Sequence, residues 1–209
     1  RQMCIRDRHK MNDEILREAM FYDGVSVEIR SAADDNRKQA EDVHYFIDEG
    51  VDLLIISANE AAPMTPIVEE AYQKGIPVIL VDRKILSDKY TAYIGADNRE
   101  IGASMGEYLA GALPKGGRVV ELCGLSSSSP AIERAEGFDS VVAVRPSIDI
   151  VAKFHADWTE QGGFRAMDSL LRSPHPDFDC LFAHNDRMAM GARRAAQQHG
   201  LDLQRIRFC

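Results

Sequence analysis

Short apolar runs alternate along this chain with longer segments that have the period of a helix. The apolar runs cover residues 25–32, 51–58, 76–83, 118–124, 148–156 and 180–186. Each is followed by about 15 residues in which apolar side chains recur at helical spacing. Four of the six runs have lost the alternation of polar and apolar residues, as strands do when helices cover both faces of a sheet. The pattern predicts an α/β protein with parallel sheets.

Glycine and proline residues mark the ends of the predicted helices. Gly50 and Gly75 stand where a glycine would end the helices that begin near Asp35 and Pro66. Pro66 and Pro130 suit the first turn of a helix, where a missing N–H group costs nothing. These positions agree with the strands predicted from the apolar runs.

The chain is organised as two similar units rather than one long sheet. Residues 90–98 predict a strand with polar flanks, and a helix follows over about residues 99–113. A turn at residues 114–117 then starts a second series of strands and helices. We therefore expect an N-terminal lobe over residues 9–98 and a C-terminal lobe over residues 99–209.

Both ends of the chain depart from this pattern. Residues 1–8 have no periodicity and are interpreted as a non-native leader. The first predicted helix, about Met11 to Phe21, has no strand before it, so the first lobe would lack the strand that opens such a sheet. Residues 205–209 begin like another strand and then stop. We expect a fold that is truncated at both ends.

The composition argues against a membrane-spanning segment, nucleic acid binding and a cysteine-based metal site. The 209 residues are 45% hydrophobic and 28% charged, and no apolar run approaches the roughly 20 residues that cross a bilayer. The net charge of −8 opposes binding to nucleic acid, because phosphates would be repelled. The four cysteines are far apart and form no C-x-x-C motif, so they suggest neither a zinc site nor a disulfide framework.

Enzyme motifs are absent from the sequence. CGLSSSS lacks the second glycine of G-x-S-x-G, and GADNREIGASMG does not match the dinucleotide-binding pattern. The histidines are scattered, and His44, His155 and His184 are interpreted as structural or surface residues. We predict no catalytic residue, no metal site and no cofactor for this segment.

Open parallel sheets bind ligands at the carboxyl ends of their strands, and Asp82 and Arg83 stand at such an end. A carboxylate that only accepts hydrogen bonds and a guanidinium with five donors could together grip neighbouring hydroxyl groups of a polyol. The alternative is an ordinary ion pair at a strand end, which local chemistry alone favours.

The second half holds three further candidates, two at strand ends and one on a helix. Asn185 could contact a ligand while Asp186 caps the helix that follows. Trp158, the one tryptophan, could stack on the C–H face of a sugar, or it could serve packing alone. Arg134 follows a serine-rich loop on a helix and is expected to point back over the strand ends.

With these residues in place, the chain resembles the ribose-binding branch of the type I periplasmic binding proteins and LacI-type regulators. The segments VDLLIISANEAAPMTPIVEEAYQKGIPVILVDRKI, YIGADNREIGASMGEYLAG, AIERAEGF and CLFAHNDRMAMGARRA carry the resemblance. It implies two Rossmann-like lobes joined by a hinge, which close on a sugar. It also implies a set of ligand contacts, namely Asp82, Arg83, Arg134, Trp158 and Asn185, with Asn98 and Ser57 as further candidates.

A narrower resemblance is to the periplasmic sensor domains of Bacteroidetes hybrid two-component systems. MNDEILREAMFYDGVSVEIRSAADDN and NEAAPMTPIVEEAYQKGIPVILVDRKILSDKYTAYIGADN look like that subgroup. This implies a periplasmic sugar sensor, tethered by a C-terminal membrane helix to a histidine kinase and able to form a homodimer in the full-length receptor. The family's opening strand, its aromatic-bearing first loop and its closing segments are missing, so the sugar itself is not indicated.

Three alternatives remain. A free sugar-binding protein of an ABC transporter differs only in the segments that come after the domain. The ligand-binding core of a LacI-type regulator would need a helix-turn-helix upstream. An α/β enzyme is the third, and a turnover assay would test it.

Overall fold

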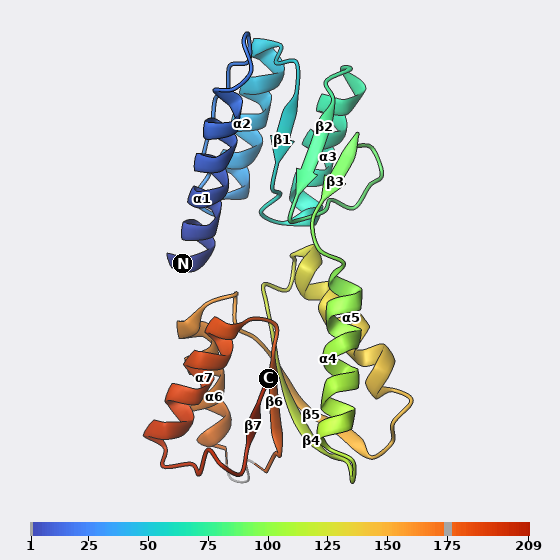
Figure 1. Ribbon diagram of the computed structural model, residues 1–209, viewed down its shortest axis with the longest axis vertical. Helices are drawn as coiled ribbons and strands as arrows, with labels where there is room; N and C mark the ends of the chain where they lie inside the picture. Colours follow the sequence, from blue (N-terminus) through green and yellow to red (C-terminus); the bar gives the residue numbers. More distant parts are fainter. Residues whose placement is uncertain (1, 174–176) are drawn as a thin grey trace.

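The computed structural model describes residues 2–173 and 177–209, with side chains from Lys10 onward, and has two α/β lobes stacked along its long axis (Figure 1). The first lobe contains α1 (Gln2–Ala19), α2 (Asn36–Glu49), β1 (Leu54–Ile56), α3 (Ala61–Gln73), β2 (Val78–Val81) and β3 (Ala92–Ile94). The second contains α4 (Asn98–Ala112), β4 (Gly117–Cys123), α5 (Ser129–Val142), β5 (Ile148–His155), α6 (Glu160–Leu171), β6 (Cys180–Ala183), α7 (Asp186–Gln198) and β7 (Arg207–Phe208).

Each lobe is built on its own parallel sheet. The first sheet has the order β1-β2-β3, and the second has the order β5-β4-β6-β7. The chain passes from one sheet to the other at residues 95–97, between β3 and α4 (Figure 1). The predicted α/β fold with two parallel-sheet lobes is therefore confirmed.

Each lobe has its own apolar core, which packs helices against its sheet. In the first lobe, α2 and α3 contact each other and bury Val43, Met64 and Val68 against Val78 and Leu80 of β2. In the second lobe, the two faces of the sheet have different cores. One is formed with α6 and α7, and the other with α4 and α5. Among the described residues, no helix has the length and apolar character needed to span a bilayer.

Glycines bring α4 and α5 into close contact. A methyl group on Gly102 of α4 would collide with the carbonyl oxygen of Arg134, and one on Gly137 of α5 would collide with that of Arg99. The two helix backbones can approach this closely only because both positions lack a Cβ atom. The contact sets the position of Arg134, which lies on α5 three residues before Gly137.

The strand predicted for residues 25–32 was wrong. The structure has no strand there, and Val25 and Ile29 are 55% and 37% exposed. An extended segment becomes a strand only when a neighbour exchanges backbone hydrogen bonds with it. Within the described residues, β1 pairs only with β2, so residues 25–32 exchange no ladder hydrogen bonds with it.

Two predicted helix starts also require correction. Helix α1 begins at Gln2 rather than near Met11, so the backbone of residues 2–8, which were interpreted as a non-native leader, is helical. Helix α3 begins at Ala61 rather than near Pro66, which lies inside the helix. Because proline has no N–H group, the carbonyl oxygen of Ala62, four residues earlier, receives no helical hydrogen bond from Pro66. Both residues are exposed, so water can bind this carbonyl instead. Gly50, Gly75 and Pro130 occupy the predicted helix ends.

The close contact between α4 and α5 gives a stability prediction. Replacing Gly137 with alanine should lower the free energy of unfolding of the second lobe by about 1–3 kcal/mol, because the helices must separate. Gly111→Ala is the matched control, since nothing lies within 4 Å of an added Cβ there. It should leave stability unchanged or raise it by up to about 1 kcal/mol. Pulse-labelling hydrogen exchange in urea on the full-length protein measures both, and equal effects would contradict the prediction.

Candidate functional site

Asp82 stands in a strained turn at the end of β2. Its φ of 65° lies in the left-handed region, which is uncommon for a residue other than glycine. The turn is held by backbone bonding from Asp82 N to Ile94 O (2.9 Å) and by the hydroxyl of Tyr93, which donates to Asp82 O (3.1 Å). The turn directs the Asp82 side chain outward, with 62% of it exposed, and places Arg83 inside.

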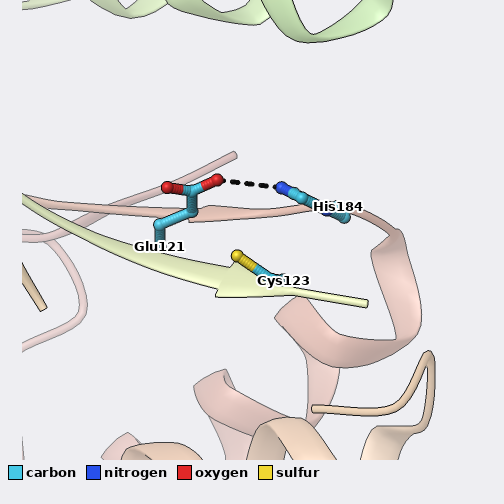
Figure 2. Close-up of side chains that lie close together, drawn as sticks. All are labelled: Glu121, Cys123 and His184. Atoms are coloured by element: carbon cyan, nitrogen blue, oxygen red, sulfur yellow. Dashed lines mark hydrogen bonds and ion pairs between the residues drawn. The ribbon is translucent and has the colours of Figure 1, made fainter. Parts of the chain in front are cut away.

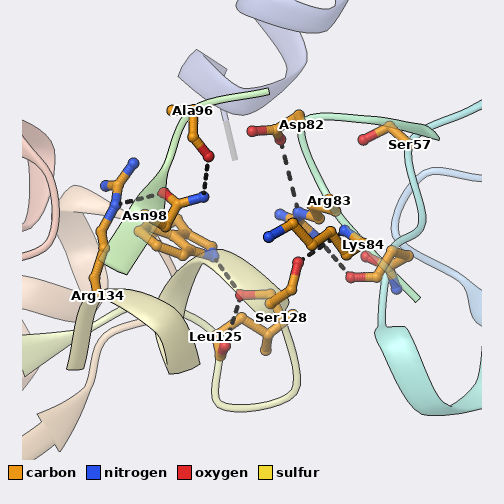
Figure 3. Close-up of polar contacts among 12 residues, drawn as sticks. Ser57, Asp82, Arg83, Lys84, Ala96, Asn98, Leu125, Ser128 and Arg134 are labelled. Atoms are coloured by element: carbon orange, nitrogen blue, oxygen red, sulfur yellow. Dashed lines mark hydrogen bonds and ion pairs between the residues drawn. The ribbon is translucent and has the colours of Figure 1, made fainter. Parts of the chain in front are cut away.

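Arg83 is buried between the turn and the loop that follows β1. Only 6% of its side chain is exposed, and Nη1 donates to the carbonyl oxygen of Asn59 at 2.5 Å. Its Nε lies 3.9 Å from Oδ2 of Asp82, so the ion pair considered from the sequence is present but loose (Figure 3). Asn59 is itself held by Asn36 and Gln39. This packing fixes the guanidinium at the base of the first lobe.

Arg134 occupies the corresponding place in the second lobe. Its Nε donates to Oδ1 of Asn98 at 2.9 Å, its Nη1 donates to the carbonyl oxygen of His184, and its guanidinium carbon lies 5.5 Å from the ring centroid of Trp158 (Figure 3). Burial lowers the pKa of Arg134, and the negative charge of Asp82 in the other lobe opposes that shift. The electrostatic field of Asp82 thus reaches across to the second lobe.

Trp158 and Asn185 meet at the ends of β5 and β6. Trp158 has a φ of 62°, and its indole N–H donates to Oγ of Ser128 at 3.3 Å. The side-chain amide of Asn185 donates to the carbonyl oxygen of Trp158 at 3.2 Å, and its Oδ1 accepts from Met188 N at 2.9 Å. The prediction that Asp186 caps this helix was wrong, because α7 begins at Asp186 and Asn185 is the cap.

Asn98 and Ser57 differ in their surroundings. Asn98 is 2% exposed at the start of α4, and its amide donates to the carbonyl oxygen of Ala96 (3.2 Å) while its Oδ1 receives Arg134. Ser57 lies at the end of β1, apart from the Arg134 group (Figure 3). Its hydroxyl oxygen is buried and has no hydrogen-bond partner among the described residues. Asn98 is thus part of the group around Arg134, and Ser57 is not.

Direct contacts between the lobes were not predicted from the sequence. The backbone N–H of Lys84 donates to Oγ of Ser129 at 2.8 Å, and its Nζ lies 2.7 Å from Oε1 of Glu133. Ala61 N also donates to the carbonyl oxygen of Ser127 at 3.2 Å. The serine-rich loop before α5 therefore lies against the first lobe. The sequence showed only that this loop follows the end of a strand. No sequence pattern indicated that it contacts Lys84.

A cavity lies beside this contact. It has a volume of about 350 Å³ and is lined by Lys84, Tyr93, Gly95, Ala96, Asp97, Arg99 and Glu133. Gly95, Ala96 and Asp97 belong to the connection between the lobes, and the other lining residues come from the lobes on either side of it. The cavity is therefore separate from the side chains of Asp82, Arg134, Trp158 and Asn185.

Three potential metal ligands lie close together in the second sheet. Glu121, Cys123 and His184 are buried, and each offers one donor atom within 4.8 Å of the others (Figure 2). Burial and the nearby Glu121 carboxylate raise the pKa of the Cys123 thiol to about 12, which disfavours the thiolate that a metal needs. The ammonium group of Lys153, 2.8 Å from Oε2 of Glu121, also opposes a cation at this position.

Residues 10–206 match the family of periplasmic binding protein domains. The chain belongs to this family. Periplasmic binding protein domains bind ligands and are not enzymes, and the periplasmic location predicted from the sequence is that of the family. The prediction of a type I periplasmic binding fold is confirmed with it.

Individual relatives agree with this assignment. The ribose import binding protein of Bacillus subtilis (strain 168) is 35% identical over 185 residues, which are 88% of this chain and 60% of the relative. The fructose-binding periplasmic domain of a hybrid two-component system superposes with a TM-score of 0.91 at 67% identity, covering 96% of this chain and 66% of that structure. A myo-inositol-binding protein of Caulobacter superposes with a TM-score of 0.89 at 26% identity, covering 99% of this chain and 69% of that structure.

This periplasmic binding protein domain spans about 60% of the length of the curated relatives that it matches. Its described residues form two parallel sheets, a segment that joins them and the strand-end loops described above.

The pair Lys84–Glu133 should hold the lobes in their observed arrangement. We expect Lys84→Glu to lengthen the distance between spin labels on exposed Gln73 and Gln198, because two carboxylates then face each other across the lobes. Adding Glu133→Lys should restore the distance. Lys89→Glu, which breaks a pair with Glu69 inside the first lobe, is the matched control and should leave it unchanged. An unchanged distance in Lys84→Glu, measured by pulsed electron paramagnetic resonance on the full-length protein, would refute the role of this pair.

Proposed function

We propose that this domain binds a monosaccharide between its two lobes and reports it as the periplasmic sensor of a two-component receptor. The observation that carries the proposal is that Asp82 and Arg83 of one lobe and Trp158 and Asn185 of the other follow the ends of strands, the usual ligand position in open parallel sheets. Arg134 of α5 lies beside Trp158. Their chemistry suits a polyol, because it combines charged hydrogen-bonding groups with one aromatic surface.

Each of these side chains has a specific role in the proposal. The exposed Asp82 carboxylate accepts hydrogen bonds from sugar hydroxyl groups, and the guanidinium groups of the buried Arg83 and the half-buried Arg134 donate to sugar oxygens. Trp158 stacks on the C–H face of the ring. Asn185, Asn98 and the hydroxyl of Ser57 are further contacts. A sugar with the wrong stereochemistry leaves such groups unpaired, at a cost of about 1–3 kcal/mol each.

Fructose is the first ligand to test. The structure that is 67% identical to this chain is described as a fructose-binding periplasmic domain, whereas the ribose-binding relative is 35% identical. Calorimetric titration of the full-length protein with fructose, ribose, galactose and myo-inositol would rank the ligands. We expect the tightest binding for fructose. Equal affinity for all four, or binding of none, would refute this assignment.

Closure of the lobes converts binding into a signal in this proposal. A ligand that contacts both lobes binds the closed arrangement more tightly than the open one, and it shifts the population by that difference in affinity. The direct contacts of Lys84 with Ser129 and Glu133 support a closed arrangement in which the lobes already meet at one side. The sugar then completes the contact at the Asp82 side.

Two alternatives share the proposed sugar binding but differ from a sensor in the segments that accompany the domain. The 67% identical structure is the periplasmic domain of a hybrid two-component system, which favours a receptor tethered by a membrane helix and able to dimerise. The relatives that import ribose favour a free binding protein of an ABC transporter instead. A LacI-type regulator is the remaining possibility, and a DNA-binding segment in the full-length protein would identify it.

Substitutions in the first lobe test the binding site itself. For the wild-type protein, sugar at about 100 times its dissociation constant should add about 2.7 kcal/mol of stability. Arg83→Ala should abolish the resulting rise in melting temperature. Asp82→Asn, which keeps a residue suited to the left-handed turn, should reduce it strongly. The exposed Arg37→Ala is the control. A full melting shift in Arg83→Ala at saturating fructose would exclude Arg83 from the site.

Phosphorylation tests the sensor role. In membranes that contain the full-length protein, fructose should change the rate of autophosphorylation from ATP, and Arg83→Ala should remove that response. A full-length protein that binds fructose but incorporates no phosphate would instead support the transporter alternative.

A further inference from the structure

A carboxylate is buried inside the second sheet, where charged groups are costly. Glu121 lies within β4 between apolar neighbours, and its side chain and that of His184 are both 0% exposed. A buried charge without partners would destabilise the fold by several kcal/mol, since it loses its hydration. The proposed ligand contacts described above include neither residue. The pair therefore requires an explanation of its own.

Glu121 has a hydrogen bond with His184 and an ion pair with Lys153. Nε2 of His184 lies 3.0 Å from Oε1 of Glu121, and Lys153 Nζ lies 2.8 Å from Oε2. Burial raises the pKa of Glu121, but the hydrogen bonds from His184 and Lys153 outweigh it, so the pKa lies below its ordinary value. The backbone N–H of Gly124 donates to Nδ1 of His184 at 3.4 Å. Nε2 therefore carries the ring proton and donates to the carboxylate.

The backbone of His184 links this pair to the candidate site. Its carbonyl oxygen accepts the hydrogen bond from Nη1 of Arg134, and its N–H donates to the carbonyl oxygen of Leu122 at 3.0 Å. The next residue is Asn185, whose side chain holds the loop of Trp158. An anchored imidazole ring thus fixes the backbone from which Arg134 and Asn185 are both positioned.

The ion pairs extend to the helix that carries Arg134. Lys153 of β5 contacts Asp139 of α5 at 2.6 Å as well as Glu121 of β4. Asp139 and Arg134 lie on the same helix, so the network ties α5 to the sheet on one side and to the loop of His184 on the other. Arg134 is a half-buried cation, and the His184 carbonyl is one of the two acceptors that its guanidinium contacts within the described residues.

We infer that Glu121 and His184 are positioning residues for the sugar site: they hold the His184 carbonyl, and through it the guanidinium of Arg134, in the geometry that binds the ligand. This inference rests on the proposed binding of a sugar. A purely structural pair would contribute to the stability of the lobe and would leave the affinity of a folded variant unchanged. The two roles are therefore separable by measuring affinity and stability on the same variants.

The decisive variant removes both polar partners together. Glu121→Leu/His184→Phe replaces them with apolar groups of similar shape, so no buried charge is left unpaired and the lobe should stay folded. We expect at least a tenfold loss of fructose affinity by calorimetry on the full-length protein. His184→Gln, whose amide can still donate to Glu121, should stay within about threefold of the wild type. His184→Leu should lose at least tenfold.

A double-mutant cycle identifies the path of the effect. In an Arg134→Ala background, the Glu121→Leu/His184→Phe change should cost little further affinity, because the guanidinium that Glu121 and His184 position is already absent. In an Asp82→Asn background, the same change should keep its full effect, since Asp82 belongs to the other lobe.

Wild-type affinity in a folded Glu121→Leu/His184→Phe variant would overturn the inference while leaving the proposed function intact. If that variant does not fold, equal affinities of His184→Gln and His184→Leu would overturn it equally. Absence of fructose binding in the wild type would refute the proposed function and this inference together.

Discussion

The close contact between α4 and α5 is the constraint on which the second lobe's site depends. Gly102 and Gly137 allow the two backbones to touch, and this brings Asn98, the first residue of α4, against Arg134 of α5. A guanidinium that is partly withdrawn from water needs acceptors for its N–H groups. The helix contact supplies Asn98, and the loop after β6 supplies the His184 carbonyl. The site is thus a consequence of how two helices pack, more than of the local sequence around Arg134.

In each lobe, residues with left-handed backbone conformations position side chains of the candidate site. In the first lobe, a left-handed turn at Asp82 separates an exposed carboxylate from a buried guanidinium. In the second, the left-handed residues Asp157 and Trp158 place an indole ring beside Arg134. Such conformations cost about 1–3 kcal/mol each and persist where the surrounding structure holds them. Their position at the strand ends of both sheets is what a preformed ligand site requires, because ordering on binding would weaken affinity.

The sequence predicted the sheets and most of the candidate residues, since these depend on local patterns. Apolar runs predicted β1, β2, β4, β5 and β6, and the polar-flanked segment 90–98 predicted β3. The ends of strands indicated Asp82, Trp158 and Asn185. Residues 25–32 failed because their apolar pattern alone cannot supply a neighbouring strand. Lys84–Glu133 and Glu121–His184 were missed because their partners lie 49 and 63 residues apart. Such pairs exist only after the chain has folded, and no local pattern predicts them.

A crystal structure of the fructose complex tests most directly whether one sugar contacts both lobes. We expect electron density for one sugar molecule that is within hydrogen-bond distance of Asp82 or Arg83 on one side and of Arg134 or Asn185 on the other, with its C–H face on Trp158. Density for the sugar on one lobe alone, or at the cavity beside Lys84, would contradict it.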